Sequence, residues 1–589
     1  MRRDGAKHAA MKILLLHPED RFPKPVRAGD WDLVIDFGRA PISTYERWSR
    51  EAACRVISLY DFAQETDDSH RVRELLQFGM GQIVDSSGID WWDVMSLMIV
   101  PELQQLMLLS RLGNKLLPGC ELHTSRPGPL ATALRVLSGG RLINRENGLS
   151  SIFRRAQRYP EVVSRLDTAQ LFQIVQDKFD PEHRIRRRLV RHRSGSRKPV
   201  VLLPSAYVNV SRMAVSYARL LPDHDFLLVC ARNSGRLKSL PPNVSMASLD
   251  PYFTSTNHRV INSVMEGWDN LKKRLINSAD EFKIADATGM LRRIPALLRG
   301  GVATGDAWNQ VFETENVIAC LSADDTAPYT RIPLILAKKQ GIPALACHHG
   351  ALDYRMAVKT NYADWYLAKG DMEKDYLLRQ CEIAPEKIAV GGPPHKDTLA
   401  RPIVGGGDKT WLVFFTEPYQ AAGWRVDEVY REILPRLSWL AETCGLQLVF
   451  KLHPFEGEKG HRRWLRRYLP DEESEIRVIC GSPTAELWQK TRFAMTVQST
   501  IALECTSLGI PVFLCAWLKN PFAGYVQQFE RFGAGIVLHS PQQISDIPFL
   551  LESRPVKSSG EARLWQTMEP EKLRELFSGQ YSLRIASTA

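Results

Sequence analysis

Side chains that could take part in chemistry stand directly after several short apolar stretches of this sequence. Asp324 and Asp325 follow the stretch "VIACLSA", and His348, His349 and Gly350 follow "IPALAC". Carboxylates and imidazoles can take or give a proton, and a glycine lets the backbone come close to a ligand. In open parallel sheets, ligands bind just outside the carboxyl ends of the strands. If the apolar stretches are parallel strands, residues at these positions meet a ligand.

The tetrapeptide "KLHP", residues 451–454, places a lysine and a histidine at the end of another apolar stretch. Pro454 biases His453 away from helical geometry, so we expect the imidazole in a loop. There His453 can donate a hydrogen bond to a phosphate oxygen, and Lys451 can add positive charge. The alternative is a loop histidine that bonds only to its own backbone.

The stretch "QSTIALECTSLGIPVFL", residues 498–514, predicts a helix that starts beside the same edge. Ser499 or Thr500 can cap this helix, whose first N–H groups favour an anion. Glu504 lies one turn further on, where its carboxylate could accept hydrogen bonds from ribose hydroxyls. The alternative is an ordinary helix cap followed by a surface glutamate.

The elements that must hold these residues are short apolar strands alternating with helices. The clearest series lies within residues 409–550, with the strands "TWLVFFTEP", "LQLVFKLHP", "IRVICG", "FAMTVQS" and "IPVFLCA" separated by helix-length amphipathic segments. Such alternation predicts parallel strands joined by right-handed crossovers, and therefore a doubly wound sheet. Two similar α/β series precede it, beginning at "KILLLH" and "KPVVLLPSAY", and the Gly- and Pro-rich residues 391–410 mark a hinge.

Several of these motifs, in this order, resemble a known family. The order "HHG", "ADWYLAKGDMEKDYL", "KIAVGGPPHKD", "FFTEPY", "KLHP" and "STIALE" before "GIPVFL" is similar to that of GT-B glycosyltransferases with cytidine-nucleotide donors. These include bacterial sialyl- and polysialyltransferases, Kdo transferases of capsule assembly and teichoic-acid glycerophosphotransferases. The resemblance covers roughly residues 315–545. "GGPPHKD" lacks the arginine and asparagine of the teichoic-acid pattern and "FFTEPY" lacks its P-T-x-R order, which weakens the glycerophosphate interpretation.

The resemblance implies an α/β fold with a GT-B-like pair of Rossmann-type doubly wound parallel-sheet domains and an additional N-terminal α/β domain. We expect five segments: an N-terminal α/β domain (11–182), a basic linker (183–198), an acceptor-side Rossmann-like domain (199–400), a nucleotide-donor-binding Rossmann-like domain (409–555) and a C-terminal helical tail (556–589). The residues that it implies for donor binding are Lys451, His453, Ser499, Thr500 and Glu504.

A sugar transferase also needs a base that takes the proton of the acceptor hydroxyl, and three residues are candidates. Sialyl- and polysialyltransferases of this kind use an acidic residue of the acceptor-side domain, which "SADD" resembles, so we favour Asp324 or Asp325. The teichoic-acid pattern favours His349, which can contact either donor phosphate or acceptor. Gly350 and Glu417 are expected elsewhere in the cleft.

Composition and charge restrict the partners. With 44% apolar and 24% charged residues, the chain has the composition of a folded globular protein, and its formal net charge of +11 favours acidic partners. The basic run of residues 183–198 could face an anionic membrane surface, where each basic side chain contributes about 1 kcal/mol, or be a solvated linker. It lacks the interleaved aromatic residues of nucleic-acid binders, so we expect no nucleic acid. We expect no required cofactor or metal, because histidine, lysine and a helix N-terminus can neutralise a phosphate.

The sequence therefore predicts an enzyme, a metal-independent GT-B glycosyltransferase of capsule polysaccharide biosynthesis. It would move a sugar from a nucleotide-sugar donor, cytidine-linked by resemblance, to a glycan or lipid-linked acceptor. No segment has the 18 or more uninterrupted apolar residues of a membrane span, and no signal peptide is evident, so we expect a cytoplasmic protein that can bind the inner face of the membrane. The alternatives are a CDP-glycerol or polyol phosphotransferase, a nucleotide-sugar epimerase and a non-catalytic binding module.

Overall fold

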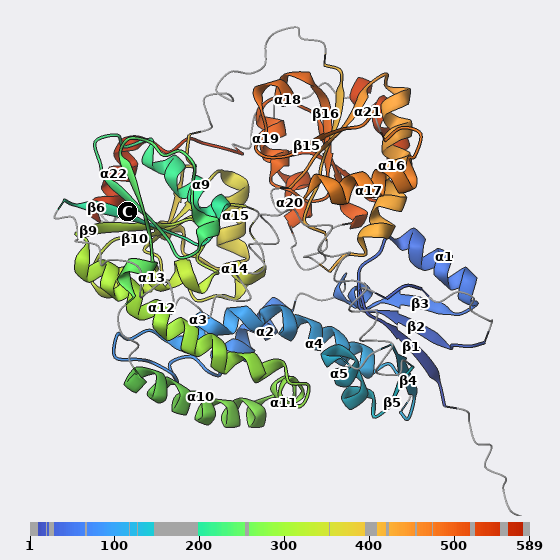
Figure 1. The fold of residues 1–589 in the computed structure, drawn as a ribbon, viewed down its shortest axis with the longest axis horizontal. Coiled ribbons are helices and arrows are strands. Elements are labelled where there is room, and N and C mark those ends of the chain that lie inside the picture. Colours follow the sequence, from blue (N-terminus) through green and yellow to red (C-terminus); the bar gives the residue numbers. More distant parts are fainter. Residues whose placement is uncertain are drawn as a thin grey trace, which may run out of the picture.

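Three parallel β-sheets, each flanked by helices, organise the molecule (Figure 1). The computed structural model describes residues 10–18, 20–22, 29–64, 68–116, 118–125, 128–145, 198–253, 258–350, 352, 354–394, 409–419, 423–453, 456–473, 475–518, 525–553 and 564–580. Pro454 and all of the basic run 183–198 except Lys198 lie outside them. The topology confirms the expected fold class: α/β, with a pair of doubly wound sheets and an additional N-terminal α/β domain.

The N-terminal unit is built on the first sheet. Its strands, in spatial order, are β3 (Arg55–Ser58), β2 (Leu33–Asp36), β1 (Lys12–Leu16), β4 (Glu121–Thr124) and β5 (Arg141–Asn144). Its helices are α1 (Ile42–Ala52), α2 (Ser69–Gln77), α3 (Trp91–Ser96), α4 (Val100–Gly113) and α5 (Pro129–Ser138).

The middle unit is built on the second sheet. Its strands, in spatial order, are β12 (Ile388–Val390), β11 (Trp365–Ala368), β10 (Ala344–Ala346), β9 (Val317–Ser322), β6 (Val200–Ser205), β7 (Phe226–Cys230) and β8 (Val244–Ser248). Its helices are α9 (Val208–Ala218), α10 (His258–Ser278), α11 (Asp280–Ala287), α12 (Ile294–Thr314), α13 (Pro328–Lys339), α14 (Tyr354–Val358) and α15 (Asp371–Arg379). The strands are nearly all apolar because helices cover both faces of a parallel sheet.

The third unit is built on the third sheet. Its strands, in spatial order, are β15 (Arg477–Ile479), β14 (Gln447–Lys451), β13 (Trp411–Phe415), β16 (Thr491–Thr496), β17 (Val512–Cys515) and β18 (Ile536–Leu538). Its helices are α16 (Val426–Thr443), α17 (Glu458–Tyr468), α18 (Ala485–Lys490), α19 (Ile501–Ser507), α20 (Tyr525–Arg531) and α21 (Ile547–Ser553). The prediction of five strands was wrong by one, because β18 is an edge strand of only three residues, too short an apolar run to be recognised.

The chain returns to the middle unit at its C-terminal end. Helix α22 (Pro570–Ser578) lies beside the second sheet in Figure 1, far from the third sheet that precedes it in sequence. Its buried side chains Leu573, Leu576 and Phe577 share a core with Leu203 and other residues of that sheet. Within the described residues, no helix combines the length and apolar character needed to cross a membrane.

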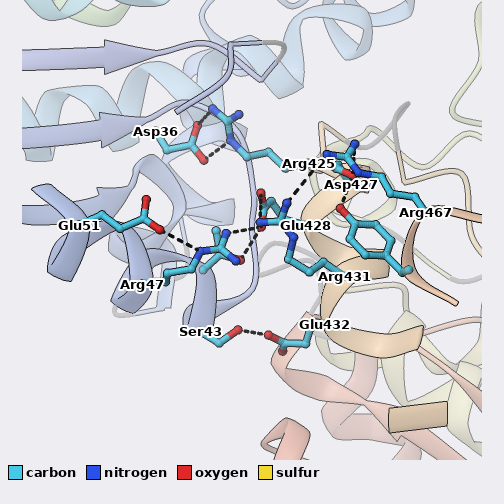
Figure 2. Close-up of polar contacts among 12 residues, drawn as sticks. Asp36, Ser43, Arg47, Glu51, Arg425, Asp427, Glu428, Arg431, Glu432 and Arg467 are labelled. Atoms are coloured by element: carbon cyan, nitrogen blue, oxygen red, sulfur yellow. Dashed lines mark hydrogen bonds and ion pairs between the residues drawn. The ribbon is translucent and has the colours of Figure 1, made fainter. Parts of the chain in front are cut away.

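The N-terminal unit contacts both other units. Helices α2, α3 and α4 run alongside α10, α11 and α12, and the Trp92 ring stacks near the Trp268 ring with centroids 6.1 Å apart (Figure 1). On its other side, Arg425 of the third unit reaches Asp36 at the end of β2, with Nη2 and Oδ1 2.6 Å apart (Figure 2). The extra unit is thus packed against both members of the pair.

Candidate active site

One cluster of polar side chains lies where β6 and β9 adjoin in the second sheet. This is the switch point of the sheet, since the strand order runs outward in both directions from these two neighbours. Tyr207, after β6, donates its hydroxyl hydrogen to Asp324, which follows β9 and is only 1% exposed. Thr326 donates to the same carboxylate from its N–H, at 2.9 Å, and from its hydroxyl, at 2.7 Å. Three donors therefore hold Asp324 at the edge where ligands bind.

His349 completes this cluster. Its ring centroid lies 5.3 Å from that of Tyr207, and Nδ1 lies 3.3 Å from the Ala323 carbonyl oxygen. In the tautomer that donates from Nδ1, the Nε2 lone pair can accept a proton. Burial and the neighbouring His348 lower the pKa of His349 to about 4. Burial alone would raise the pKa of Asp324, but the two histidines and Tyr207 outweigh it and lower that pKa to about 2. At neutral pH the cluster is a carboxylate beside an uncharged imidazole.

Asp325 points elsewhere, although it is the next residue. Its Oδ2 lies 2.7 Å from the Lys359 Nζ, and both side chains are almost completely buried. This ion pair stabilises the interior under the loop, so the geometry favours Asp324 over Asp325 as a group that meets substrate. Gly350 has open space where a Cβ would stand, as a ligand-facing glycine needs, while the His348 ring bonds within its own turn to Gly350.

The carboxyl edge of the third sheet carries Lys451 and His453. The His453 N–H donates to the Thr416 hydroxyl at 3.0 Å, which fixes the loop after β14 against the loop after β13. Burial lowers the pKa of both His453 and Lys451. The positive charge of Arg212 lowers the pKa of Lys451 further. Arg212 is exposed on α9, so a charge of the middle unit contributes to the lowered pKa of a lysine in the third unit.

Glu417 occupies the switch point of the third sheet, between β13 and β16. Its Oε1 accepts from the Gln498 N–H at 2.7 Å and lies 3.4 Å from the Thr496 hydroxyl. Burial raises the pKa of Glu417 to about 7, although the Gln498 N–H opposes this shift. A second carboxylate, Glu456, raises that pKa further and accepts from Thr416. This edge therefore holds a carboxyl group that can exchange a proton near neutral pH.

Ser499 and Thr500 lie in the turn between β16 and α19, at the same edge of the third sheet as Glu417. Ser499 Oγ accepts from the Ile501 N–H at 3.4 Å, whereas Thr500 makes no capping bond with its side chain. Helix α19 has seven residues, and Glu504 lies partly buried in its first turn. Ser499 is therefore the residue that stabilises the start of this short helix.

Comparisons with known proteins gave matches among solved structures only. No protein-family model and no curated protein sequence matches the chain. The UDP-GlcNAc 2-epimerase of Methanocaldococcus jannaschii is 12% identical, with a TM-score of 0.39 over 67% of this chain and all of the other. A glycosyltransferase of Rickettsia africae is 12% identical, with a TM-score of 0.38 over 66% of this chain and 97% of the other. The wall teichoic acid polymerase TagF is 11% identical, with a TM-score of 0.38 over 75% of this chain and all of the other.

Four residues join the site that the sequence did not single out: Tyr207, Arg212, Thr416 and Glu456. Tyr207 and Thr416 closely follow the apolar runs "VVLLPSA" and "WLVFF", so a stricter search of strand ends would have found them. Arg212 and Glu456 lie further from any strand end. Only the packing of the two units brings Arg212 near Lys451, and no local pattern signals it.

Proposed function

We propose that this protein is a GT-B glycosyltransferase that moves a sugar from a nucleotide-sugar donor to a glycan or lipid-linked acceptor of surface polysaccharide. The supporting observation is that the switch points of two doubly wound sheets carry complementary polar sets. Tyr207, Asp324 and His349 lie at one, and Lys451, His453 and Glu417 lie at or beside the other. Arg212, on α9 beside the first set, contributes to the lowered pKa of Lys451 in the second, which supports the two sets acting on one ligand.

In this mechanism Asp324 accepts the proton of the acceptor hydroxyl as the oxygen attacks the anomeric carbon. The bond from that carbon to the nucleotide phosphate breaks, and its electron pair leaves on the phosphate oxygen. Lys451 and a hydrogen bond from His453 stabilise the developing charge, which a neutral imidazole can do through its one N–H. Because Lys451 supplies positive charge and His453 a hydrogen bond, the proposed reaction needs no metal, and we propose a cytidine nucleotide as the leaving group.

An ion pair between the third and middle units also supports a fixed position of the proposed donor-binding residues relative to Asp324. Arg531 of α20 in the third unit lies 2.7 Å from Asp375 of α15 in the middle unit. The basic run of residues 183–198 would provide positive charge towards an anionic membrane that carries a lipid-linked acceptor.

Nucleotide binding tests the proposal. We would measure stabilisation and heats of binding of the wild type with CMP, CDP, UMP, UDP and GDP, and repeat them with His453→Ala. We expect a cytidine nucleotide to bind best and His453→Ala to weaken it by about tenfold or more, because a hydrogen bond to a charged group is lost. His539→Ala is the matched control, since His539 is exposed in the same unit, and it should bind like the wild type.

Three other outcomes would count against parts of this proposal. Preference for UDP or GDP would exclude the cytidine donor while leaving a nucleotide-dependent enzyme. If His453→Ala bound the nucleotide as tightly as the wild type, His453 would not be a donor-binding residue. Absence of binding at millimolar concentration would overturn the transferase and favour a non-catalytic module.

A further inference from the structure

A buried ion pair joins the N-terminal unit to the middle unit directly beneath the Asp324 loop. Asp93, on α3, accepts from Arg331, on α13, with Nη2 2.7 Å and Nε 3.2 Å from Oδ2. Both side chains are only 1% exposed. The ring of Tyr362 covers the guanidinium, with its centroid 4.9 Å from Cζ. This ion pair between the two units is thus shielded from solvent.

The guanidinium of Arg331 also holds the backbone of the Asp324 loop, which joins β9 to α13. Nη1 donates to the Asp325 carbonyl oxygen at 3.1 Å, and Nη2 donates to the Thr360 carbonyl oxygen at 2.9 Å. The Asp325 carboxylate is itself paired with Lys359, at 2.7 Å. Arg331 therefore fixes the residue that directly follows Asp324, while Tyr207 and Thr326 fix the Asp324 carboxylate itself.

We propose that Asp93 of the N-terminal unit is a positioning residue for Asp324, acting through Arg331 and the backbone of Asp325. This role rests on the proposed transferase function and assigns the extra unit a part in it. A buried guanidinium needs a negative partner, and with Asp93 neutral the nearest remaining one is Asp325. Arg331 would then turn towards Asp325 and draw the loop away from Tyr207. Displacements of about 1 Å in a catalytic group can cost on the order of a hundredfold in rate.

The test compares Asp93→Asn with Glu281→Gln. Glu281, in the first turn of α11, forms another ion pair between the same two units, with its Oε1 3.0 Å from Arg71 Nε, and no contact between Glu281 and the Asp324 loop is seen among the described residues. One readout is the Cε1–H resonance of His349, assigned with His349→Gln, because this ring lies beside Tyr207 and reports on the loop without any substrate. Binding of CMP and release of CMP from CMP-N-acetylneuraminic acid are measured on the same full-length proteins.

We expect Asp93→Asn to shift the His349 resonance and to lower turnover by about tenfold or more, while CMP binds within roughly twofold of the wild type. Glu281→Gln should leave all three unchanged. An unshifted resonance in Asp93→Asn, or an equal shift in Glu281→Gln, would overturn the positioning role. If the wild type neither binds CMP nor releases it, the proposed CMP-linked donor fails, and the His349 resonance alone decides the role of Asp93.

A second variant covers the case in which Asp93→Asn folds poorly. Asp93→Asn with Arg331→Gln removes both charges, so the cost of an unpaired buried guanidinium disappears and the melting temperature should recover. Arg331→Gln also removes the guanidinium that donates to the Asp325 carbonyl oxygen, so the His349 resonance should stay shifted and turnover low. Recovery of both stability and the resonance would show a purely structural pair and overturn the proposal.

Discussion

At the scale of single residues, Glu417 should make the protein sensitive to pH. Its folded-state pKa of about 7 exceeds the ordinary glutamate value, so the folded protein binds this proton more tightly than the unfolded chain. The resulting stability is complete below the unfolded-state pKa and is lost as pH rises through about 7. Between pH 5.5 and pH 8 the loss in the free energy of unfolding is on the order of 2 kcal/mol, which lowers the melting temperature by roughly 4 to 8 °C for a unit of this size. Glu417→Gln should not show this loss.

Melting temperatures at pH 5.5 and pH 8 would check this. The wild type should lose stability relative to Glu417→Gln as pH rises, whereas Glu442→Gln, which changes an exposed carboxylate of the same unit, should parallel the wild type. Parallel curves for wild type and Glu417→Gln would mean that Glu417 is ionised like a surface carboxylate.

The two adjacent aspartates should respond in opposite ways. Asp324→Asn should lower turnover by roughly a hundredfold or more as the proposed base is lost, and should cost less stability than Asp325→Asn because it leaves no buried cation unpaired. Asp325→Asn leaves Lys359 buried without its carboxylate and should cost about 3 to 5 kcal/mol of stability. Turnover and melting temperature of both variants test this together. A stable, inactive Asp325→Asn beside an active Asp324→Asn would reverse the assignment.

The sequence predicted the positions of these residues better than their roles. The rule that ligands bind after parallel strands located Asp324, His349 and His453, because strand ends are visible as apolar runs. It could not separate Asp324 from Asp325, since their partners Tyr207 and Lys359 come from distant parts of the chain. Side-chain direction at a strand end depends on packing that no local pattern records.

At the scale of elements, the longer apolar strands were predictable and the short or polar ones were not. "KILLLH", "TWLVFFTEP" and "LQLVFKLHP" are β1, β13 and β14 of the structure. The unpredicted strands are β5 and β8, which mix polar with apolar residues, and β18, which has only three residues. A buried strand is recognised in a sequence as an apolar run of about four or more residues, and none of these three strands has one.

Helix α12 packs against α3 through glycines, and this contact gives an element-scale prediction. A Cβ on Gly301 would overlap the Met95 methyl group and lie 2.7 Å from Trp91 Cζ3, whereas a Cβ on Gly300 meets nothing within 4 Å. Gly301→Ala should therefore destabilise by about 1 to 3 kcal/mol through overpacking. Gly300→Ala, its neighbour on the same helix, should stabilise by up to about 1 kcal/mol through helix propensity. Thermal unfolding of both variants checks the contact, and equal effects would contradict it.

At the scale of the whole molecule, the N-terminal unit determines how the other two are held. The strongly apolar residues 92–118 form most of α3 and α4, but an apolar pattern does not say what covers these helices. The structure shows α3 against α12 on one side and Asp36 against Arg425 on the other. The N-terminal unit thus contacts both units whose sheet edges carry the proposed site.

Arg425 is the residue on which the second of these contacts depends. It donates to both Asp36 oxygens, at 2.6 and 2.7 Å (Figure 2). It also donates to the carbonyl oxygens of His17 and Asp20. Because Asp36 is fully buried, Arg425→Met leaves a charge without its partner and should cost about 3 to 5 kcal/mol. Arg47→Gln is the control: it breaks the more exposed contact to Glu428 in the same interface and should cost no more than about 1 kcal/mol.

Loss of this contact should separate units rather than unfold the third one. The proposed donor-binding residues all lie within the third unit, so Arg425→Met should bind nucleotide as tightly as the wild type does in the same measurement. Turnover should fall nevertheless, because Asp324 lies in the middle unit and the two edges must keep their spacing. Solution scattering should show a larger radius of gyration for Arg425→Met than for Arg47→Gln. Unchanged dimensions with unchanged turnover would mean that the direct contact between Arg531 and Asp375 is sufficient to hold the pair.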